Sequence, residues 1–281
     1  MRALILGATG MLGKDLVPAF AAHEVIGLGS RDVDLRNTQD ILAAVRAAHA
    51  DWIILSAAYA DVDGCELNPD QAFAVNRDGA VHVARAAVEC GARLLFISSD
   101  YVFDGEKTVP YETGDARNPI NVYGRSKAEA ECRLLEVVPA CCIVRTSWLF
   151  GVGGKCFPDT ILRAALTRPE LRVVDDQRGC PTYTADLAVA VEKLTRESAS
   201  GIVHATNRGS CSWFEFASAI LAAESSNTTV TPVTSAEFPR PARRPRYSVL
   251  GSGSLQPYGI ALPAWEDGLA AYLRKRRDGV A

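Results

Sequence analysis

The sequence has no excess of basic residues and no long apolar run. Its 281 residues include 30 Lys and Arg against 33 Asp and Glu, which gives a formal net charge of −3. A dedicated nucleic-acid binder would normally be strongly basic. No apolar run approaches the roughly 18 residues that a membrane-spanning helix needs. We therefore expect neither a nucleic acid nor a membrane as a partner.

The sequence also lacks a CxxC pair, internal repeats and low-complexity tracts. Its eight cysteines are scattered, so a zinc site is not indicated, and unpaired thiols suit a reducing compartment. The apolar N-terminal residues lead directly into a glycine motif, which a signal peptide would not need. An apolar fraction of 48% and a charged fraction of 22% are ordinary for a globular protein. These features predict a cytoplasmic protein of one extended domain or two coupled ones.

A glycine-rich turn stands between a predicted buried strand at residues 2–6 and a predicted helix at residues 14–22. Glycines at such a turn let the backbone approach a pyrophosphate, and the helix N-terminus offers free N–H groups. In this context the GxxGxxG pattern predicts a dinucleotide site, although similar turns also bind flavins, other nucleotides or nothing. The cofactor contacts predicted here are Gly7, Thr9, Gly10, Met11, Leu12 and Gly13.

The end of the second predicted strand, at residues 24–28, indicates which dinucleotide is bound. An acidic residue at this place would select NAD, but the chain has Ser30 and Arg31, a pair suited to a 2′-phosphate. We predict NADPH, with NADH as an accepted alternative. The other interpretation is that Arg31 lies in solvent. Asp34 and Leu35 are expected to flank the adenine.

A third predicted strand, at residues 51–55, leads into small residues across which a cofactor can lie. Ala57, Ala58 and Tyr59 are therefore included in the predicted cofactor site. Asn76 follows in an apolar helical stretch. It is interpreted either as a satisfied core amide or as a brace for the catalytic loop.

A fourth predicted strand begins at Leu94 and ends at Ser98 and Ser99, and Tyr123 and Lys127 follow one helical turn apart. Reduction of a ketone needs a proton for the developing alkoxide, which Tyr123 can supply if a nearby cation lowers its pKa from roughly 10. Lys127 can provide that cation and bind the nicotinamide ribose, while Ser99 can donate to the carbonyl oxygen. Ser98 is expected beside the cofactor. The alternative is a surface tyrosine beside a solvated lysine; the preceding glycine turn and strand-end serines favour catalysis.

Strands and helices alternate through a further predicted strand at residues 141–146, which predicts an α/β fold with a Rossmann-type doubly wound parallel sheet. Beyond residue 150 the chain becomes richer in loops and carries a basic run at 240–246. We predict a dinucleotide-binding domain at 1–150 and a smaller substrate-binding region at 151–281. Some later helices are expected to pack back on the first domain.

With these residues in place, the chain resembles the extended short-chain dehydrogenase/reductases, and among them the dTDP-4-dehydrorhamnose reductase family. The resemblance extends over nearly the whole chain. The most specific motifs are residues 100–105 (DYVFDG) and 145–148 (RTSW). Further matches are Gly7-Ala8-Thr9-Gly10, Ala57-Ala58-Tyr59, Val62-Asp63, Asn121-Val122-Tyr123-Gly124, Asp176-Gln177, Gly179-Cys180-Pro181-Thr182 and Arg244-Pro245.

The resemblance implies an NADPH-dependent reduction of the C4 ketone of dTDP-4-dehydro-6-deoxy-L-mannose to dTDP-L-rhamnose. It implies that Ser99 and Asp100 bind the sugar carbonyl region, that Tyr101 belongs to the sugar pocket and that Trp148 lines it. Gln177 and the region of Arg244 would meet the nucleotide part of the dTDP-sugar.

Two alternatives are left open: a reductase of another dTDP-4-keto-6-deoxyhexose, and a non-catalytic dinucleotide-binding regulatory homologue like the subunit associated with methionine adenosyltransferase. A dehydratase is disfavoured because Tyr101, not a glutamate, follows Asp100. Some family members are described as binding Mg²⁺ between subunits through glutamates. Asp15 could replace one of these, but residues 184–186 offer no second glutamate. We therefore predict no metal requirement and leave the subunit count open, with a homodimer as the assembly considered.

Overall fold

The computed structural model describes residues 1–278, so residues 279–281 of the predicted substrate-binding region lie outside the described part. Its centre is a six-stranded parallel sheet in the order β10-β5-β4-β3-β1-β2. The predicted doubly wound parallel sheet is therefore confirmed. The strands are β1 (Arg2–Leu6), β2 (Glu24–Leu28), β3 (Trp52–Leu55), β4 (Arg93–Ser99), β5 (Cys142–Thr146) and β10 (Gly201–His204).

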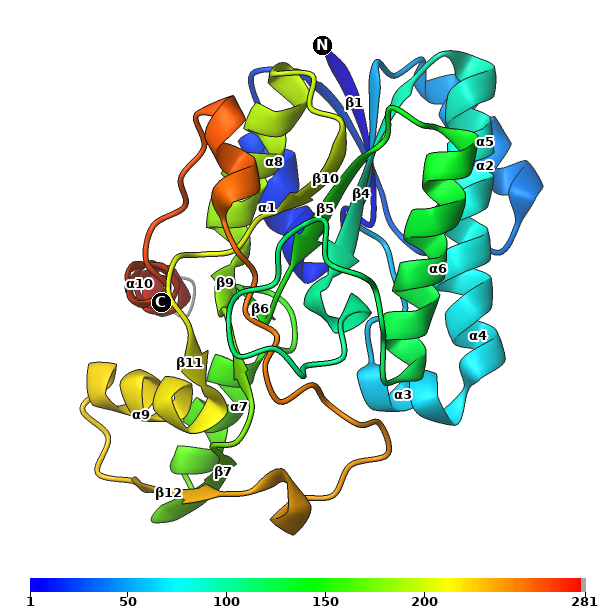
Figure 1. Ribbon diagram of the computed structural model, residues 1–281. Coiled ribbons are helices and arrows are strands. Elements are labelled where there is room, and N and C mark those ends of the chain that lie inside the picture. The colour runs from blue at the N-terminus through cyan, green and yellow to red at the C-terminus, as the bar shows by residue number, and fades with distance from the viewer. Residues whose placement is uncertain (279–281) are drawn as a thin grey trace.

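Helices cover both faces of this sheet (Figure 1). One face carries α2 (Thr38–Ala48), α5 (Gly79–Cys90) and α6 (Val122–Val137), and the other carries α1 (Met11–Ala19) and α8 (Thr184–Arg196). Successive residues of β4 enter the two cores alternately, with Phe96 on the α5 side and Leu95 on the α8 side. Burial on both faces explains why the strands are continuous apolar runs in the sequence.

The strand order reverses beside β1, which pairs with both β2 and β3. Ligands of such sheets bind at this point, outside the carboxyl ends of the strands. The turn after β1 depends on Gly7, whose φ of +100° is unfavourable for other residues and whose added Cβ would lie 2.6 Å from the Ala57 nitrogen. Helix α1 begins at Met11, three residues before the predicted start at residue 14, because the glycine turn is that short.

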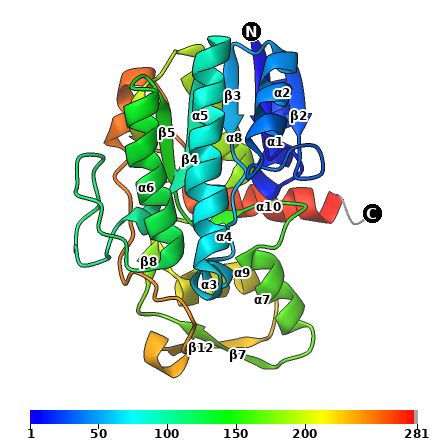
Figure 2. The same cartoon turned by 90° about the vertical axis from the view of Figure 1, so that its right-hand side faces the viewer.

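A smaller lobe lies beyond the carboxyl ends of the strands (Figures 1 and 2). It has its own apolar core, to which Phe150, Phe216 and Tyr272 contribute. Its elements are β6 (Leu149–Phe150), α7 (Phe157–Ala165), β7 (Glu170–Val174), β8 (Arg178–Gly179), β9 (Thr182–Tyr183), β11 (Cys211–Ser212), α9 (Trp213–Ala223), β12 (Thr229–Val233), η3 (Ser235–Glu237) and α10 (Trp265–Asp278). Two of its short strands, β8 and β9, lie in the part beyond residue 150 that the sequence indicated as richer in loops.

The chain passes between lobe and sheet more than once. Helix α8 packs on α1, and β10 joins the sheet beside β5, although both follow residue 150. The sequence predicted the returning helices but not the returning strand. Four short helices complete the fold: α3 (Val62–Leu67), α4 (Pro69–Phe73), η2 (Asp100–Val102) and η4 (Gly253–Tyr258), together with one π-helical segment, η1 (Ala74–Asp78).

Among residues 1–278, no helix is both long and apolar enough to cross a membrane. All eight cysteines fall within these residues and each is a free thiol. Cys141 and Cys142 are buried in and beside β5, where burial raises the pKa of both thiols. They act as small apolar core residues.

Candidate active site

A cleft of about 510 Å³ lies at the reversal of strand order. Residues from the glycine turn and from the ends of β2 and β3 line it. Helix α1 points its N-terminus there, and its N-cap, Gly10, supplies no side-chain cap, so backbone N–H groups are available to an anion. This arrangement fits a dinucleotide. The predicted residues that line the cleft are Gly7, Thr9, Gly10, Met11, Leu12, Gly13, Ser30, Asp34, Leu35, Ala57 and Ala58.

Arg36, which the sequence analysis overlooked, lines this cleft, whereas Arg31 is exposed and is not among the lining residues. The guanidinium of Arg36 donates from Nε to Oδ1 of Asp34 at 3.0 Å and from a terminal nitrogen to Oδ2 at 2.6 Å. These bonds lower the pKa of Asp34 to about 2. Two guanidiniums, those of Arg31 and Arg36, therefore lie near the end of β2. The only feature of the sequence that could have pointed to Arg36 was its position five residues after Arg31.

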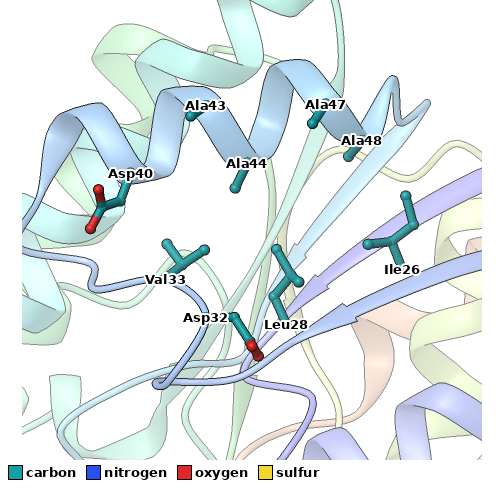
Figure 3. Close-up of a pocket in the computed structure, with 9 residues that line it drawn as sticks. All are labelled: Ile26, Leu28, Asp32, Val33, Asp40, Ala43, Ala44, Ala47 and Ala48. Atoms are coloured by element: carbon teal, nitrogen blue, oxygen red, sulfur yellow. The ribbon is translucent and has the colours of Figure 1, made fainter.

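An apolar recess of about 430 Å³ adjoins the cleft between β2 and α2 (Figure 3). Ala43, Ala44 and Ala47 of α2 face Ile26 and Leu28 of β2 across it. The two cavities share Leu28 and Val33. The end of the cleft beside β2 is therefore apolar, as an adenine ring requires.

Asn76 lies in the π-helical segment and connects the cofactor loop to α6. Its Oδ1 accepts from the Tyr59 nitrogen at 2.8 Å, and its Nδ2 donates to the Tyr59 oxygen and to Oγ of Ser126, each at 3.0 Å. Ser126 in turn donates to the Tyr123 carbonyl. Both interpretations of Asn76 therefore hold, because the amide is buried, fully bonded and braces the loop against the helix of Tyr123.

Tyr123 and Lys127 lie in the first two turns of α6, whose N-cap Asn121 accepts from the Gly124 nitrogen at 2.8 Å. Lys127 is only 2% exposed, so the alternative of a solvated lysine is wrong. Its Nζ donates to the Ile97 carbonyl at 2.6 Å and lies 4.0 Å from the centre of the Phe96 ring. Burial lowers the pKa of Lys127 to about 7.

The pKa of Tyr123 moves in the direction opposite to the one expected. Burial raises it above its ordinary value, and a hydrogen bond from Ser99 opposes that rise only in part. The expectation relied on the ammonium of Lys127, but that group donates to the Ile97 carbonyl, and its own pKa near 7 leaves it only partly charged at neutral pH. In this structure Tyr123 is therefore held as the neutral phenol, the form that can give a proton.

Asp100 is buried at the end of β4 and is surrounded by hydroxyl groups. Ser99 donates to Oδ1 at 3.0 Å and Ser147 donates to Oδ2 at 2.8 Å, while Ser248 is a third donor. Burial raises the pKa of Asp100 to about 6, against the effect of these hydrogen bonds. Ser99 has one hydroxyl proton, so it serves either Asp100 or Tyr123 at a given moment. The sequence analysis did not predict the roles of Ser147 and Ser248.

Ser98 points to the opposite face of the sheet from Ser99. Its Oγ donates to Oε1 of Glu131 at 2.5 Å, inside the protein. Glu131 also binds Arg145 and Arg117 at 2.7 and 2.6 Å. The contacts of Ser98 are thus with a buried ion network, not with the cofactor cleft.

Trp148 and Gln177 meet in the smaller lobe through Trp213, which the sequence analysis did not include in the site. The rings of Trp148 and Trp213 are parallel within 5°, with centres 3.4 Å apart. The Trp213 nitrogen donates to Oε1 of Gln177 at 3.2 Å. Trp148 has a φ of +45°, and a Cβ on Gly179 would lie 2.4 Å from its ring, so its position is tightly fixed.

Tyr101 and Arg244 lie near Tyr123. The rings of Tyr101 and Tyr123 meet edge to face, with centres 6.1 Å apart. Arg244 hydrogen-bonds both Tyr101 and Asp63. Of the predicted substrate-binding residues, Ser99, Asp100, Tyr101 and Arg244 therefore gather around Tyr123, whereas Trp148 and Gln177 form a second group in the lobe.

Asp15 is buried, and both of its oxygens have partners within the chain. Oδ2 accepts from Thr184 at 2.5 Å and Oδ1 accepts from Lys275 at 2.6 Å. In the part of the chain that the structure describes, no group of three or more His, Cys, Asp or Glu residues could hold a metal ion. The absence of a metal requirement stays a prediction.

The parallel sheet, the glycine turn at its reversal and the group of Ser99, Tyr123 and Lys127 define a protein of the short-chain dehydrogenase/reductase class. Its sequence matches the model of one family, described as the RmlD substrate binding domain, over residues 1–277. The chain therefore belongs to this family, and the resemblance found in the sequence is confirmed.

Two curated relatives and one solved structure resemble the chain over most of its length. It is 40% identical over 280 residues to dTDP-4-dehydrorhamnose reductase of Sinorhizobium fredii, covering 95% of each chain. It is 39% identical over 277 residues to the spore coat polysaccharide biosynthesis protein SpsK of Bacillus subtilis, covering 98% of each. The crystal structure of dTDP-4-dehydrorhamnose reductase from Bacillus anthracis, in complex with NADP, matches with a TM-score of 0.95 and 39% identity. It covers 98% of this chain and 99% of that one.

Proposed function

We propose that the protein is an NADPH-dependent reductase that converts dTDP-4-dehydro-6-deoxy-L-mannose to dTDP-L-rhamnose. The family and the NADP bound to the Bacillus anthracis relative support the cofactor and the reaction class. The observation that carries the proposal is the placement of Tyr123 and Lys127 on α6 with Ser99 at the end of the adjacent β4. Tyr59, which lies between Ala58 and Ala60 of the cleft lining, belongs to the same apolar cluster as Tyr123.

When bound, NADPH would supply the hydride. The glycine turn and the residues lining the cleft would hold it, with Ala57 and Ala58 beneath it and Lys127 near its ribose. Ser99 would donate to the C4 carbonyl oxygen and hold it against Tyr123. Tyr123, a neutral phenol whose pKa is raised further by burial, would give its proton to the developing alkoxide. Lys127, with a pKa near 7, would help to return a proton to Tyr123.

The substrate is proposed to lie between the two groups of predicted binding residues. The sugar would meet Asp100 and Tyr101 beside Tyr123, with Trp148 as a wall, and the nucleotide would extend toward Gln177 and Arg244. In this proposal, residues 1–150 bind the dinucleotide and the later region completes the sugar nucleotide site. We expect the enzyme to be cytoplasmic and to form a homodimer.

The test is turnover of purified protein with NADPH and dTDP-4-dehydro-6-deoxy-L-mannose, followed by loss of NADPH absorbance. Product analysis by chromatography should find dTDP-L-rhamnose. Turnover of another dTDP-4-keto-6-deoxyhexose in preference to this one would support the first alternative. Tight NADPH binding with no turnover of either sugar would support a non-catalytic regulatory homologue.

A further inference from the structure

Residues 240–248 form a strap that returns from the smaller lobe to the sheet. Three side chains around the active site hold it. Asp63 in the first turn of α3 binds its beginning, Asn121 donates from Nδ2 to the Arg243 carbonyl at 2.8 Å, and Ser248 at its end donates to Asp100. The strap is therefore fastened to α3, to the carboxyl end of β4 and to the cap of α6.

Asp63 makes more bonds to the strap than either other side chain. Its Oδ2 accepts from Nε of Arg240 at 2.8 Å, and its Oδ1 accepts from the Ala242 nitrogen at 3.1 Å and from Arg244. Burial would raise the pKa of Asp63, but the hydrogen bonds from Arg244 and Arg240 outweigh it and hold that pKa below its ordinary value. Asp63 is thus an anion at neutral pH, bound to two guanidiniums.

Arg244 connects this anchor to the catalytic residues. Its side chain is half-buried and hydrogen-bonds Tyr101, whose ring meets that of Tyr123. A guanidinium has five N–H donors, so bonds to Asp63, Tyr101 and the Ala242 carbonyl leave donors for a further anion. Without Asp63, electrostatic repulsion between Arg240 and Arg244 and the loss of their shared acceptor would release this side chain.

Asp63 also lies close in sequence to the cofactor loop. Helix α3 begins three residues after Tyr59, and a Cβ on Gly64 would lie 2.3 Å from the Tyr59 hydroxyl. The contacts of Gly64 and Cys65 with Tyr59 hold α3 in place, so the helix keeps its position beside the cofactor loop when only the side chain of Asp63 is changed.

We propose that Asp63 is a positioning residue, which holds the strap and orients Arg244 toward the diphosphate of the nucleotide sugar. The identity of the ligand rests on the proposed function. Independently of it, the Asp63 carboxylate affects nucleotide binding through Arg244 and does not affect binding of the dinucleotide cofactor.

The test compares Asp63→Asn, Arg244→Gln and the double variant, with dTDP itself as the probe, so that it does not depend on turnover. By calorimetry, Asp63→Asn should bind dTDP about tenfold more weakly than wild type, and Arg244→Gln similarly. The double variant should be no weaker than Arg244→Gln alone, because the carboxylate acts through that side chain. NADPH affinity, measured by its fluorescence, should stay unchanged.

Glu89→Gln is the matched control, since it removes an exposed carboxylate–arginine pair between α2 and α5, far from the strap. It should leave dTDP affinity at the wild-type value. Additive losses in the double variant, an equal loss of NADPH affinity in Asp63→Asn, or failure of wild type to bind dTDP would each overturn the proposal. Binding of dTDP that depends on Asp63, without turnover of the keto sugar, would overturn the proposed function alone.

Limited proteolysis gives a second readout. Trypsin does not cut before proline, so Arg240 and Arg244 are protected by Pro241 and Pro245, but the bonds after Arg243 and Arg246 can be cut. In Asp63→Asn, mass spectrometry should find cleavage after Arg243 several-fold faster than in wild type and in Glu89→Gln, and dTDP should slow it. Equal cleavage rates in the three proteins would show that Asp63 does not hold the strap.

Discussion

Two buried carboxylates are bonded by successive serines of β4, and their surroundings differ. Ser98 donates to Glu131, which is also bound by Arg145 and Arg117, and these bonds keep the pKa of Glu131 below its ordinary value although burial would raise it. On the other face of the sheet, Ser99 donates to Asp100, whose other side-chain partners are hydroxyl groups. The pKa of Asp100 is accordingly raised to about 6.

From this difference we infer that Glu131 is a structural anion and propose that Asp100 takes part in binding the substrate. Guanidiniums neutralise Glu131 permanently, and the network ties α6 to β5 beneath the active site. Hydroxyl groups stabilise the charge of Asp100 only partly, and in the proposed function their hydrogen bonds would be exchanged for those of a sugar. We therefore expect changes at Glu131 to affect folding and changes around Asp100 to affect activity.

The largest effect is expected from Glu131→Gln. The substitution leaves Arg145, which is fully buried, without its counter-ion. The free energy of unfolding should fall by about 3–5 kcal/mol, as measured by urea denaturation at pH 7. Glu89→Gln, which removes an exposed ion pair, should change the free energy of unfolding by much less. A similarly small change for Glu131→Gln would contradict the structural role of this network.

Tyr123→Phe should lower activity and leave stability unchanged. Loss of the phenolic proton should lower kcat by about a hundredfold or more, while the urea midpoint and NADPH affinity stay near their wild-type values. Steady-state kinetics with the keto sugar, together with NADPH fluorescence titration, measure both. Near-normal turnover in this variant would remove Tyr123 as the proton donor.

The pH dependence of stability should have opposite signs for the two carboxylates. The folded-state pKa of Asp100, about 6, exceeds the unfolded value of 3.8, so its contribution to stability is present at low pH and is lost as pH rises through this range. Between pH 4 and 7, the stability of wild type relative to Asp100→Asn should fall on the order of 2–3 kcal/mol.

The contribution of Glu131, whose folded pKa is below its ordinary 4.5, should instead be lost as pH falls below that value. Urea denaturation of wild type, Asp100→Asn and Glu131→Gln, carried from pH 7 down to below pH 4, measures both slopes. If the free energy of unfolding attributed to each carboxylate changed with pH in the same direction, the proposed difference between Glu131 and Asp100 would be wrong.

The sequence predicted the parts of this comparison that depend on local pattern. These parts are the apolar strands, the glycine turn and the spacing of Tyr123 and Lys127. The alternation of apolar strands with helices was sufficient to predict the parallel sheet. The partners of Asp100 could not be predicted in this way, because Ser147 and Ser248 come from β5's end and from the strap, 47 and 148 positions further along the chain.

The directions of the pKa shifts were also inaccessible from spacing alone. Tyr123 and Lys127 one turn apart indicated a charge interaction that would lower the pKa of the tyrosine, but burial dominates both groups. Trp213 and Arg36 were missed for a similar reason. Trp213 approaches Trp148 only after the chain has folded, whereas Arg36 reaches the cleft through the fold of the loop after β2, and neither belongs to a motif that the sequence offered.

The smallest effect on stability is expected from the ion pair of Asp34 and Arg36. This pair is largely exposed and lies at the cofactor cleft. If burial, and not pairing alone, makes the Glu131 network important for folding, Arg36→Ala should leave the Tm nearly unchanged. Because Arg36 lines the cleft, its loss should weaken NADPH binding about tenfold and leave NADH binding unchanged.

Arg31→Ala is the matched comparison for the same measurement. The sequence placed the contact to the 2′-phosphate at Arg31, but this side chain is exposed and does not line the cleft. Fluorescence titration of both variants with NADPH and NADH decides between the two guanidiniums. A selective loss of NADPH affinity in Arg31→Ala alone would assign recognition to Arg31 and leave Arg36 as the counter-ion of Asp34, whereas a loss in both would mean that the two share the phosphate.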